Sequence, residues 1–232
     1  MLAAISCGGS MAPPSPAGTE PASSSSLPEA PPPAPVATGP RLVVLGDSLT
    51  AGLGLPQNDS YPAVLGRKLK EHGYDWEVIN AGVSGDTSSD GRQRAAWALE
   101  GDVRILVLAL GANDGLRGLP VDQMKTNLQT IIDRARQRGI PVLLAGMEAP
   151  PNYGEQYAKE FRQAFVDVAH RNKVEFVPFL LEGVAGMSRL NQSDGIHPTS
   201  DGAARIADHL WPTLEKMLKN DKMSKNDQMP AR

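Results

Sequence analysis

Five short apolar runs alternate with segments of helical periodicity, and this alternation constrains the fold more than any other feature of the chain. The runs cover residues 41–45, 76–79, 103–110, 140–145 and 174–177. Between them, apolar residues recur every three or four positions, as Leu128, Ile131 and Ile132 do, which places them on one face of a helix. Strands that alternate with helices in this way predict a parallel sheet covered by helices on both faces.

The alternation ends in a final helix whose apolar stripe is formed by Ile206, Leu210, Leu214 and Leu218. Pro212 is expected to interrupt or bend this helix, because proline has no backbone N–H and its ring collides with the preceding turn. Residues 219–232 are polar and are predicted to form a disordered tail. Residues 41–218 are therefore predicted to be one domain, which is long enough to bury a full hydrophobic core.

The first 40 residues differ in composition from the rest of the chain. They hold ten of the 20 prolines and no Lys or Arg, so residues 8–40 are predicted to be a disordered linker. The preceding segment, Met1-Leu-Ala-Ala-Ile-Ser-Cys7, resembles the end of a bacterial lipoprotein signal, in which the cysteine is acylated. An upstream start codon would supply the rest of such a signal. This resemblance implies a lipid-anchored protein of the cell envelope or periplasm, whereas a leader with a chance cysteine leaves the protein cytoplasmic.

Charge and cysteine content exclude several functions for the body. Residues 41–232 hold 23 basic and 24 acidic side chains, which argues against a nucleic-acid binder, because such proteins cluster Lys and Arg. A single cysteine excludes an internal disulfide framework and a multi-cysteine zinc site. No apolar stretch of the body is long enough to span a bilayer. Nothing in the sequence implies a protein partner.

Polar, glycine-bearing segments follow the predicted strands, where parallel sheets form their ligand sites. Gly46-Asp-Ser48-Leu follows the first strand, and Ser84-Gly85-Asp86 follows the second. Gly111-Ala-Asn113-Asp-Gly follows the third strand, and Asp194-Gly-Ile-His197-Pro precedes the last helix.

These residue types permit acyl transfer by an activated hydroxyl. Ser48 can act as the nucleophile if His197 takes its proton, and Asp194 can fix the tautomer of the imidazole. The Ser48 and Gly85 backbone N–H groups and the Asn113 amide can then hold the oxyanion that develops on the substrate. No cofactor is needed for this chemistry.

Taken together, the four segments resemble the blocks of the SGNH (GDSL) hydrolase superfamily. The stretches Gly46–Gly52, Ser84–Thr87, Leu110–Gly118 and Asp194–Pro198 are similar to its thioesterase I/arylesterase/lysophospholipase branch. The resemblance covers residues 41–218. It implies a three-layer, flavodoxin-like α/β/α fold with a five-stranded parallel sheet, Ser48, Asp194 and His197 as catalytic residues, and Ser48, Gly85 and Asn113 as the oxyanion hole.

Other interpretations of the same residues remain open at this stage. Each segment taken alone could be an ordinary turn. Ser84 is a rival nucleophile, although its surroundings lack the last glycine of the Gly-x-Ser-x-Gly elbow. The aspartates at 47, 86, 114 and 194 could be imagined as a metal cluster. We expect no metal site, because no paired histidines accompany them, and we expect Asp47 and Asp86 to hydrogen-bond loop backbone.

The predicted substrate is a small-molecule ester or thioester, as the resemblance implies. Leu116 follows the oxyanion asparagine, and Pro150, Pro151 and Tyr153 lie in a loop that would offer an apolar wall for the acyl group, although this loop could also be a rigid surface connection. One alternative is an O-acetylesterase that acts on a polysaccharide or the cell wall. Another is a tethered binding module that keeps the fold without turnover. Neither the physiological substrate, the acyl-chain length nor the oligomeric state follows from the sequence.

Overall fold

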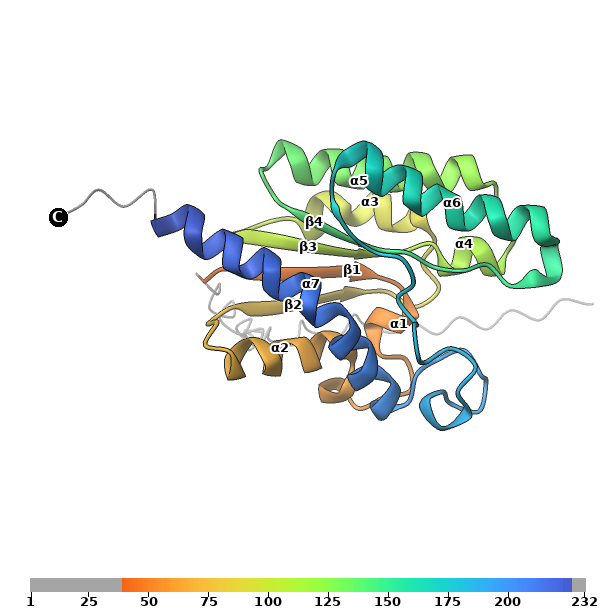
Figure 1. Ribbon diagram of the computed structural model, residues 1–232, viewed down its shortest axis with the longest axis horizontal. Coiled ribbons are helices and arrows are strands. Elements are labelled where there is room, and N and C mark those ends of the chain that lie inside the picture. Colours follow the sequence, from red (N-terminus) through yellow and green to blue (C-terminus); the bar gives the residue numbers. More distant parts are fainter. Residues whose placement is uncertain (1–38, 227–232) are drawn as a thin grey trace, which may run out of the picture. The chain divides into compact units, whose positions relative to one another are not determined.

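The computed structural model describes residues 39–226, and Figure 1 shows five strands flanked by helices. The strands form one parallel sheet in the order β2-β1-β3-β4-β5. They are β1 (Arg41–Gly46), β2 (Glu77–Gly82), β3 (Val103–Ala109), β4 (Val142–Ala145) and β5 (Glu175–Val177). The expected three-layer α/β/α fold with a flavodoxin-like, five-stranded sheet is therefore confirmed.

Helices cover both faces of the sheet (Figure 1). One face carries α2 (Tyr61–Glu71) and α7 (Ser200–Asn226), which pack against each other. The other carries α3 (Ser88–Ala98), α5 (Val121–Gln137) and α6 (Glu155–Asn172), with α5 between its two neighbours. Short helices follow two of the strands: α1 (Ser48–Ala51) comes after β1, and α4 (Ala112–Leu116) comes after β3. Single 3-10 turns occur at 57–59, 151–153 and 188–190.

The core lies on both sides of the central strands. Leu42–Leu45 of β1 and Ile105–Leu108 of β3 are almost fully buried, as expected for strands without a polar face. The helices contribute one stripe each, and the predicted stripe of α5 is buried along its length. A helix with such a stripe is stabilised mainly by this packing rather than by its own propensity.

The ends of three strands lie level with one another, and this register positions the loops that follow. Gly46 at the end of β1 pairs with Gly82 of β2 on one side and with Ala109 of β3 on the other. A Cβ atom at Gly46 would collide with Oγ1 of Thr50 and come within 2.9 Å of the Ala109 carbonyl oxygen. Only glycine lets the chain turn into α1 this close to β3.

The end of the chain differs from expectation. Helix α7 continues through Pro212 to Asn226, so residues 219–226 are helical and not part of a disordered tail. Pro212 has no backbone N–H to donate to the Asp208 carbonyl one turn earlier in the helix. Both residues are exposed, so water can make that hydrogen bond instead. Residues 227–232 and the predicted leader with Cys7 lie outside the described residues. Within residues 39–226, no helix has the length and apolar character needed to cross a membrane.

Candidate active site

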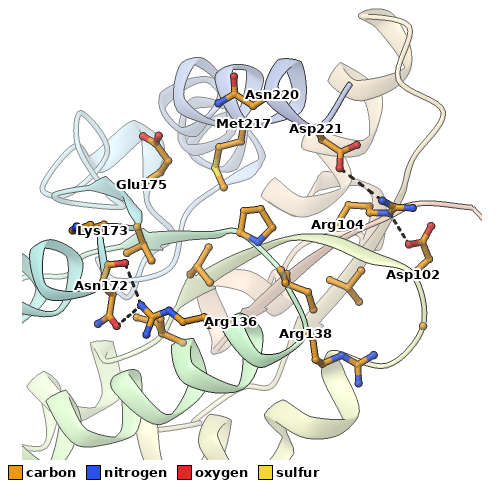
Figure 2. Close-up of a pocket in the computed structure, with 18 residues that line it drawn as sticks. Asp102, Arg104, Arg136, Arg138, Asn172, Lys173, Glu175, Met217, Asn220 and Asp221 are labelled. Atoms are coloured by element: carbon orange, nitrogen blue, oxygen red, sulfur yellow. Dashed lines mark hydrogen bonds and ion pairs between the residues drawn. The ribbon is translucent and has the colours of Figure 1, made fainter. Parts of the chain in front are cut away.

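Cavities lie at both ends of the sheet in the described part of the chain. The one at the amino ends of β3, β4 and β5 has a volume of about 870 Å3 and a lining that mixes charged and apolar side chains (Figure 2). Two of its arginines are held by other residues of the lining. Arg104 pairs with Asp102 and Asp221, and Arg136 donates to Asn172. No nucleophile with an adjacent base lines it, so the candidate site is the cavity at the opposite end.

The cavity at the carboxyl ends of the strands has a volume of about 490 Å3, and Ser48, Gly85, Asn113 and His197 all line it. The residues predicted from four separate segments are thus brought to one place. Most of the remaining lining is apolar, and it includes Leu49, Leu53, Met147, Phe179, Leu181 and Ile196.

The predicted substrate loop reaches this cavity only in part. Leu116 and Pro150 line it, but Pro151 and Tyr153 do not. The 3-10 turn that begins at Pro151 leaves both residues exposed, and the Tyr153 hydroxyl donates to the Leu116 carbonyl at 3.1 Å. The expected apolar wall therefore ends at Pro150. Its remainder comes from Phe179 and Leu181, which follow β5 in a stretch without helical or strand periodicity.

Ser48 is held at the start of α1 by its neighbour Asp47. Asp47 caps the helix, because its Oδ1 accepts the Leu49 N–H at 3.0 Å. The Asp47 side chain is buried, its Oδ2 has no hydrogen-bond partner in the described structure, and burial raises its pKa to about 6. As the first residue of the helix, Ser48 has a backbone N–H without an intrahelical acceptor. That N–H is available to a ligand.

His197 is oriented by a tight turn from Asp194. Gly195 adopts a φ of +72°, which side chains rarely allow, and this lets the chain fold back on itself. Oδ1 of Asp194 accepts the backbone N–H groups of Ile196 at 2.9 Å and His197 at 3.0 Å. Its Oδ2 lies 2.6 Å from Nδ1 of His197. The turn therefore fixes both the carboxylate and the ring that it contacts.

A continuous hydrogen-bond chain runs from Asp194 to Ser48. Nε2 of His197 lies 2.9 Å from Oγ of Ser48. The bond with His197, followed by the two backbone N–H groups, lowers the pKa of Asp194 to about 2, so this carboxylate is ionised at neutral pH. An ionised carboxylate only accepts, so Nδ1 of a neutral His197 carries the proton and Nε2 accepts from the serine hydroxyl.

Gln192 braces the histidine loop against the serine loop, a role that sequence analysis missed. Its side-chain amide donates to the carbonyls of Leu53 and Pro198, each at 2.8 Å, and its backbone N–H donates to the His197 carbonyl at 2.7 Å. Leu53 lies just beyond α1. No motif marked Gln192, because all its partners are backbone atoms, and the one in the serine loop is 139 residues away in the chain.

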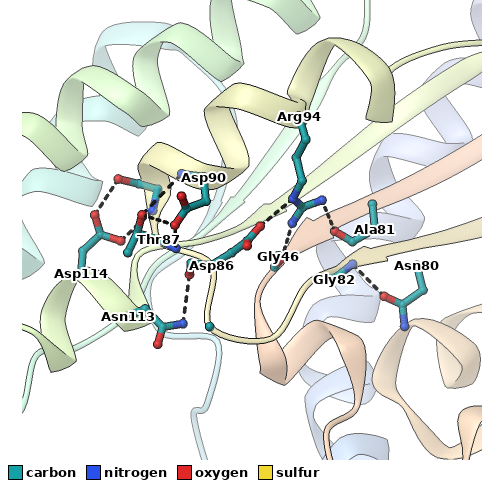
Figure 3. A network of polar contacts seen from close by, with 12 residues as sticks. Gly46, Asn80, Ala81, Gly82, Asp86, Thr87, Asp90, Arg94, Asn113 and Asp114 are labelled. Carbon is teal, nitrogen blue, oxygen red and sulfur yellow. Dashed lines mark hydrogen bonds and ion pairs between the residues drawn. The ribbon is translucent and has the colours of Figure 1, made fainter. Parts of the chain in front are cut away.

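Gly85 and Asn113 line the same cavity as the histidine. Gly85 has a φ of +86°, and its carbonyl accepts from Arg117 at 2.8 Å. Nδ2 of Asn113 donates to the Asp86 carbonyl at 3.0 Å, which orients the amide and leaves its second N–H for a ligand. Figure 3 shows this bond beside the loop that follows β2.

The expected contacts of two aspartates at this end of the sheet can be compared with the structure. The Asp47 carboxylate does accept from backbone, but from Leu49 within α1 rather than from a loop, and the Asp86 carboxylate pairs with Arg94 instead. Among the described residues, no group of three His, Cys, Asp or Glu side chains could hold a metal ion. Ser84 lines the cavity, yet the imidazole of His197 is bonded to Ser48.

A serine, a histidine and a carboxylate joined by hydrogen bonds beside free N–H donors, at the carboxyl end of a parallel sheet, define a serine hydrolase of the flavodoxin-like fold. The chain matches the GDSL-like Lipase/Acylhydrolase family over residues 44–205. It therefore belongs to that family.

Proteins similar in sequence or structure are named as esterases or thioesterases. Esterase TesA of Pseudomonas aeruginosa is 42% identical over 183 residues, which are 78% of this chain and 91% of that protein. Thioesterase 1/protease 1/lysophospholipase L1 of Escherichia coli K12 is 33% identical over 80% of this chain and 88% of that protein. The crystal structure of AlinE4, an SGNH-hydrolase family esterase, matches 84% of this chain and 100% of that chain at 37% identity, with a TM-score of 0.65. The resemblance to the SGNH superfamily is confirmed.

Proposed function

We propose that this protein is a serine esterase that hydrolyses carboxylic esters or thioesters through an acyl-enzyme on Ser48. The observation that supports this most strongly is the hydrogen-bond chain from Asp194 through His197 to the Ser48 hydroxyl at the mouth of a mainly apolar cavity. An apolar cavity with a few convergent polar groups is suited to a substrate with an apolar body and one reacting carbonyl.

In the first half of the proposed cycle, Nε2 of His197 takes the hydroxyl proton as Ser48 Oγ attacks the carbonyl carbon. The carbonyl oxygen becomes an oxyanion, which accepts from the Ser48 and Gly85 backbone N–H groups and the Asn113 amide. Asp194 stabilises the imidazolium without taking its proton. The tetrahedral intermediate then collapses, and His197 returns the proton to the departing alcohol or thiol.

In the second half, water enters in place of the leaving group. His197 takes a proton from this water, which attacks the acyl carbon and forms a second oxyanion in the same hole. Collapse of that intermediate releases the carboxylic acid, and the proton on His197 returns to Ser48 Oγ. Water is the only co-reactant, and both halves use the same three side chains.

The cavity favours an acyl group larger than acetyl. Its volume of about 490 Å3 and its lining by Met147, Phe179 and Leu181 offer room and apolar contacts that an acetyl group would leave unused. We therefore propose medium or long acyl chains, or aryl acyl groups, as substrates, in preference to the O-acetyl groups of polysaccharides.

Hydrolysis of p-nitrophenyl esters from acetate to palmitate tests both proposals. We expect turnover that rises with chain length beyond acetate and is lost in Ser48→Ala. The matched Ser84→Ala variant should keep most of the turnover, since Ser84 has no base. Turnover that survives in Ser48→Ala would contradict the mechanism. A best rate with acetate would favour the acetylesterase, and binding of ester without turnover by folded wild type would favour the binding module.

For the N-terminal segment we propose acylation of Cys7 and a place in the cell envelope. The support is the order of leader, cysteine and proline-rich linker in residues 1–40, which lie almost wholly outside the described residues. Full-length protein should then sediment with membranes and carry an acylated N-terminal cysteine by mass spectrometry. Cys7→Ser should be released into the soluble fraction. An unmodified Cys7 in soluble wild-type protein would contradict this.

A further inference from the structure

Arg94, on α3, reaches back over the carboxyl end of the sheet and donates to three separate segments (Figure 3). Its Nη2 donates to the Gly46 carbonyl at 2.7 Å, and its Nη1 donates to the Ala81 carbonyl at 2.6 Å. Its Nε donates to Oδ2 of Asp86 at 2.6 Å. One guanidinium thus joins the end of β1, the end of β2 and the loop that follows β2.

Each of the three proposed oxyanion donors is linked to a residue that this guanidinium contacts, either through a few backbone bonds or through one hydrogen bond. Gly46 lies two residues before Ser48 in the chain. Asp86 follows Gly85 directly, and its backbone carbonyl accepts the Asn113 amide. Displacing Asp86 would therefore disturb Gly85 through the backbone and Asn113 through its hydrogen bond.

Burial and geometry make this contact specific. The side chains of Arg94 and Asp86 are only 19% and 12% exposed, so water competes weakly for their hydrogen bonds. The guanidinium is planar and rigid, and its N–H groups point in fixed directions, which a flexible ammonium cannot reproduce. The Gly46 carbonyl also accepts the Val83 N–H at 3.1 Å, which adds a second link between the two strand ends.

From these contacts we infer that Arg94 is a positioning residue that holds the Ser48 N–H, the Gly85 N–H and the Asn113 amide in register for one oxyanion. The inference rests on the proposed esterase function. Arg94 does not line the cavity, so it acts on the reaction only through the segments that it joins.

The kinetic consequence is specific to the chemical step. Donors for an oxyanion act when the charge develops in the transition state, so displacing them lowers kcat more than it raises KM. A displacement of about 1 Å can cost a factor of about 100 in rate. For Arg94→Ala we expect kcat on a p-nitrophenyl ester to fall about 10- to 100-fold, with KM changed less than about threefold.

Two readouts separate positioning from a general loss of structure. Methylguanidinium added to Arg94→Ala should restore part of kcat, because it can occupy the vacated space and make the same bonds, whereas methylammonium should not. Arg94→Lys should recover little, since one ammonium cannot serve three divergent acceptors. Arg92→Ala is the matched control on the same helix. Among the described residues, Nε of Arg92 has no hydrogen-bond partner and so does not join the segments that Arg94 holds, and the variant should keep wild-type kcat.

Asp86→Asn keeps the test decisive if Arg94→Ala fails to fold. This variant leaves the Asp86 backbone carbonyl available to Asn113 but removes the charged partner of Arg94, so kcat should fall with KM retained. The inference is overturned if folded Arg94→Ala keeps kcat within about threefold of wild type, or if only its KM changes. It is also overturned if Arg94→Lys has the wild-type rate, or if methylammonium restores that rate to Arg94→Ala. With Arg94→Ala unfolded, an unchanged kcat in Asp86→Asn overturns it. Absence of ester turnover in wild type would instead refute the proposed function.

Discussion

At the scale of single residues, the charge on Asp194 decides how the protons in the site are arranged. Its carboxylate accepts three hydrogen bonds, one from the His197 ring and two from backbone N–H groups. These bonds favour the ionised form and lower its pKa to about 2. When its ring is neutral, His197 is therefore held in the tautomer that leaves Nε2 ready to accept from Ser48.

Replacing His197 by alanine should separate activity from stability. The base is lost, so kcat should fall by a factor of about 100–10,000. The free energy of unfolding should fall by only about 1 kcal/mol, because the ring sits in a loop and contributes hydrogen bonds rather than core packing. Ester kinetics and urea unfolding of the same sample measure both. Comparable losses of activity and fold would argue against the assigned role.

Asn113→Ala tests the proposed oxyanion donor, whose amide is oriented by its bond to the Asp86 carbonyl. Removal of one such donor should lower kcat by about 100- to 1,000-fold with little change in KM. Steady-state kinetics on a p-nitrophenyl ester give both values. A wild-type kcat in a folded variant would remove Asn113 from the proposed hole.

Asp47 should make stability depend on pH. Its pKa is raised from 3.8 to about 6, mainly by burial, so the folded state keeps a proton that the unfolded state loses between pH 4 and 6. Stability then falls as pH rises through this window and stays lower above it. Relative to Asp47→Asn, which keeps the acceptor for Leu49, wild type should lose about 2 kcal/mol from pH 4 to 7.

Urea unfolding of both proteins across that range measures the difference. A wild-type minus variant difference that does not vary with pH would show that Asp47 titrates normally in the folded protein.

At the scale of elements, a buried polar cluster joins three helices next to the site. Oδ1 and Oδ2 of Asp114, in α4, accept the Ser88 hydroxyl at 2.6 Å and the Ser88 N–H at 2.7 Å at the start of α3. Asn127 of α5 donates to the same hydroxyl at 3.0 Å. The cluster fixes α4, and therefore Asn113, relative to the loop that carries Gly85.

Ser88→Ala should destabilise the protein by about 1–3 kcal/mol, because it leaves one oxygen of a buried carboxylate without its donor. Burial already raises the pKa of Asp114, and loss of the hydroxyl should raise it further. The destabilisation should then be larger at neutral pH than at an acidic pH low enough to protonate Asp114 in both proteins. Urea unfolding at the two pH values checks this. Equal losses at both would contradict it.

Hydrophobic periodicity predicted the helices that are long enough to show a repeating apolar stripe. Helices α1 and α4 were missed because four or five residues cannot display an apolar stripe. The extension of α7 beyond residue 218 was missed for a related reason, since residues 219–226 carry mostly polar side chains and no stripe to pack. Their helical structure comes from continuation of a helix already formed, which is easier than starting one.

At the scale of the whole molecule, the sequence predicted where the site would lie because parallel sheets place their loops at one edge. Ser48, Gly85, Asn113 and His197 could be assigned from the loops that carry them. Other roles could not be assigned from the sequence. Arg94 and Gln192 bond backbone carbonyls, and Phe179 and Leu181 line a cavity, and these arrangements exist only once the strands are in register. The same dependence explains why Pro151 and Tyr153 were placed wrongly.

The central claim is that Ser48 carries the covalent intermediate. Its most direct test is reaction with an alkyl fluorophosphonate, followed by intact mass measurement and peptide mapping. We predict a single adduct on the peptide that contains Ser48, loss of turnover in proportion to labelling, and no adduct in Ser48→Ala. An adduct on Ser84 that accompanies the loss of activity, or full turnover by protein completely modified at Ser48, would contradict it.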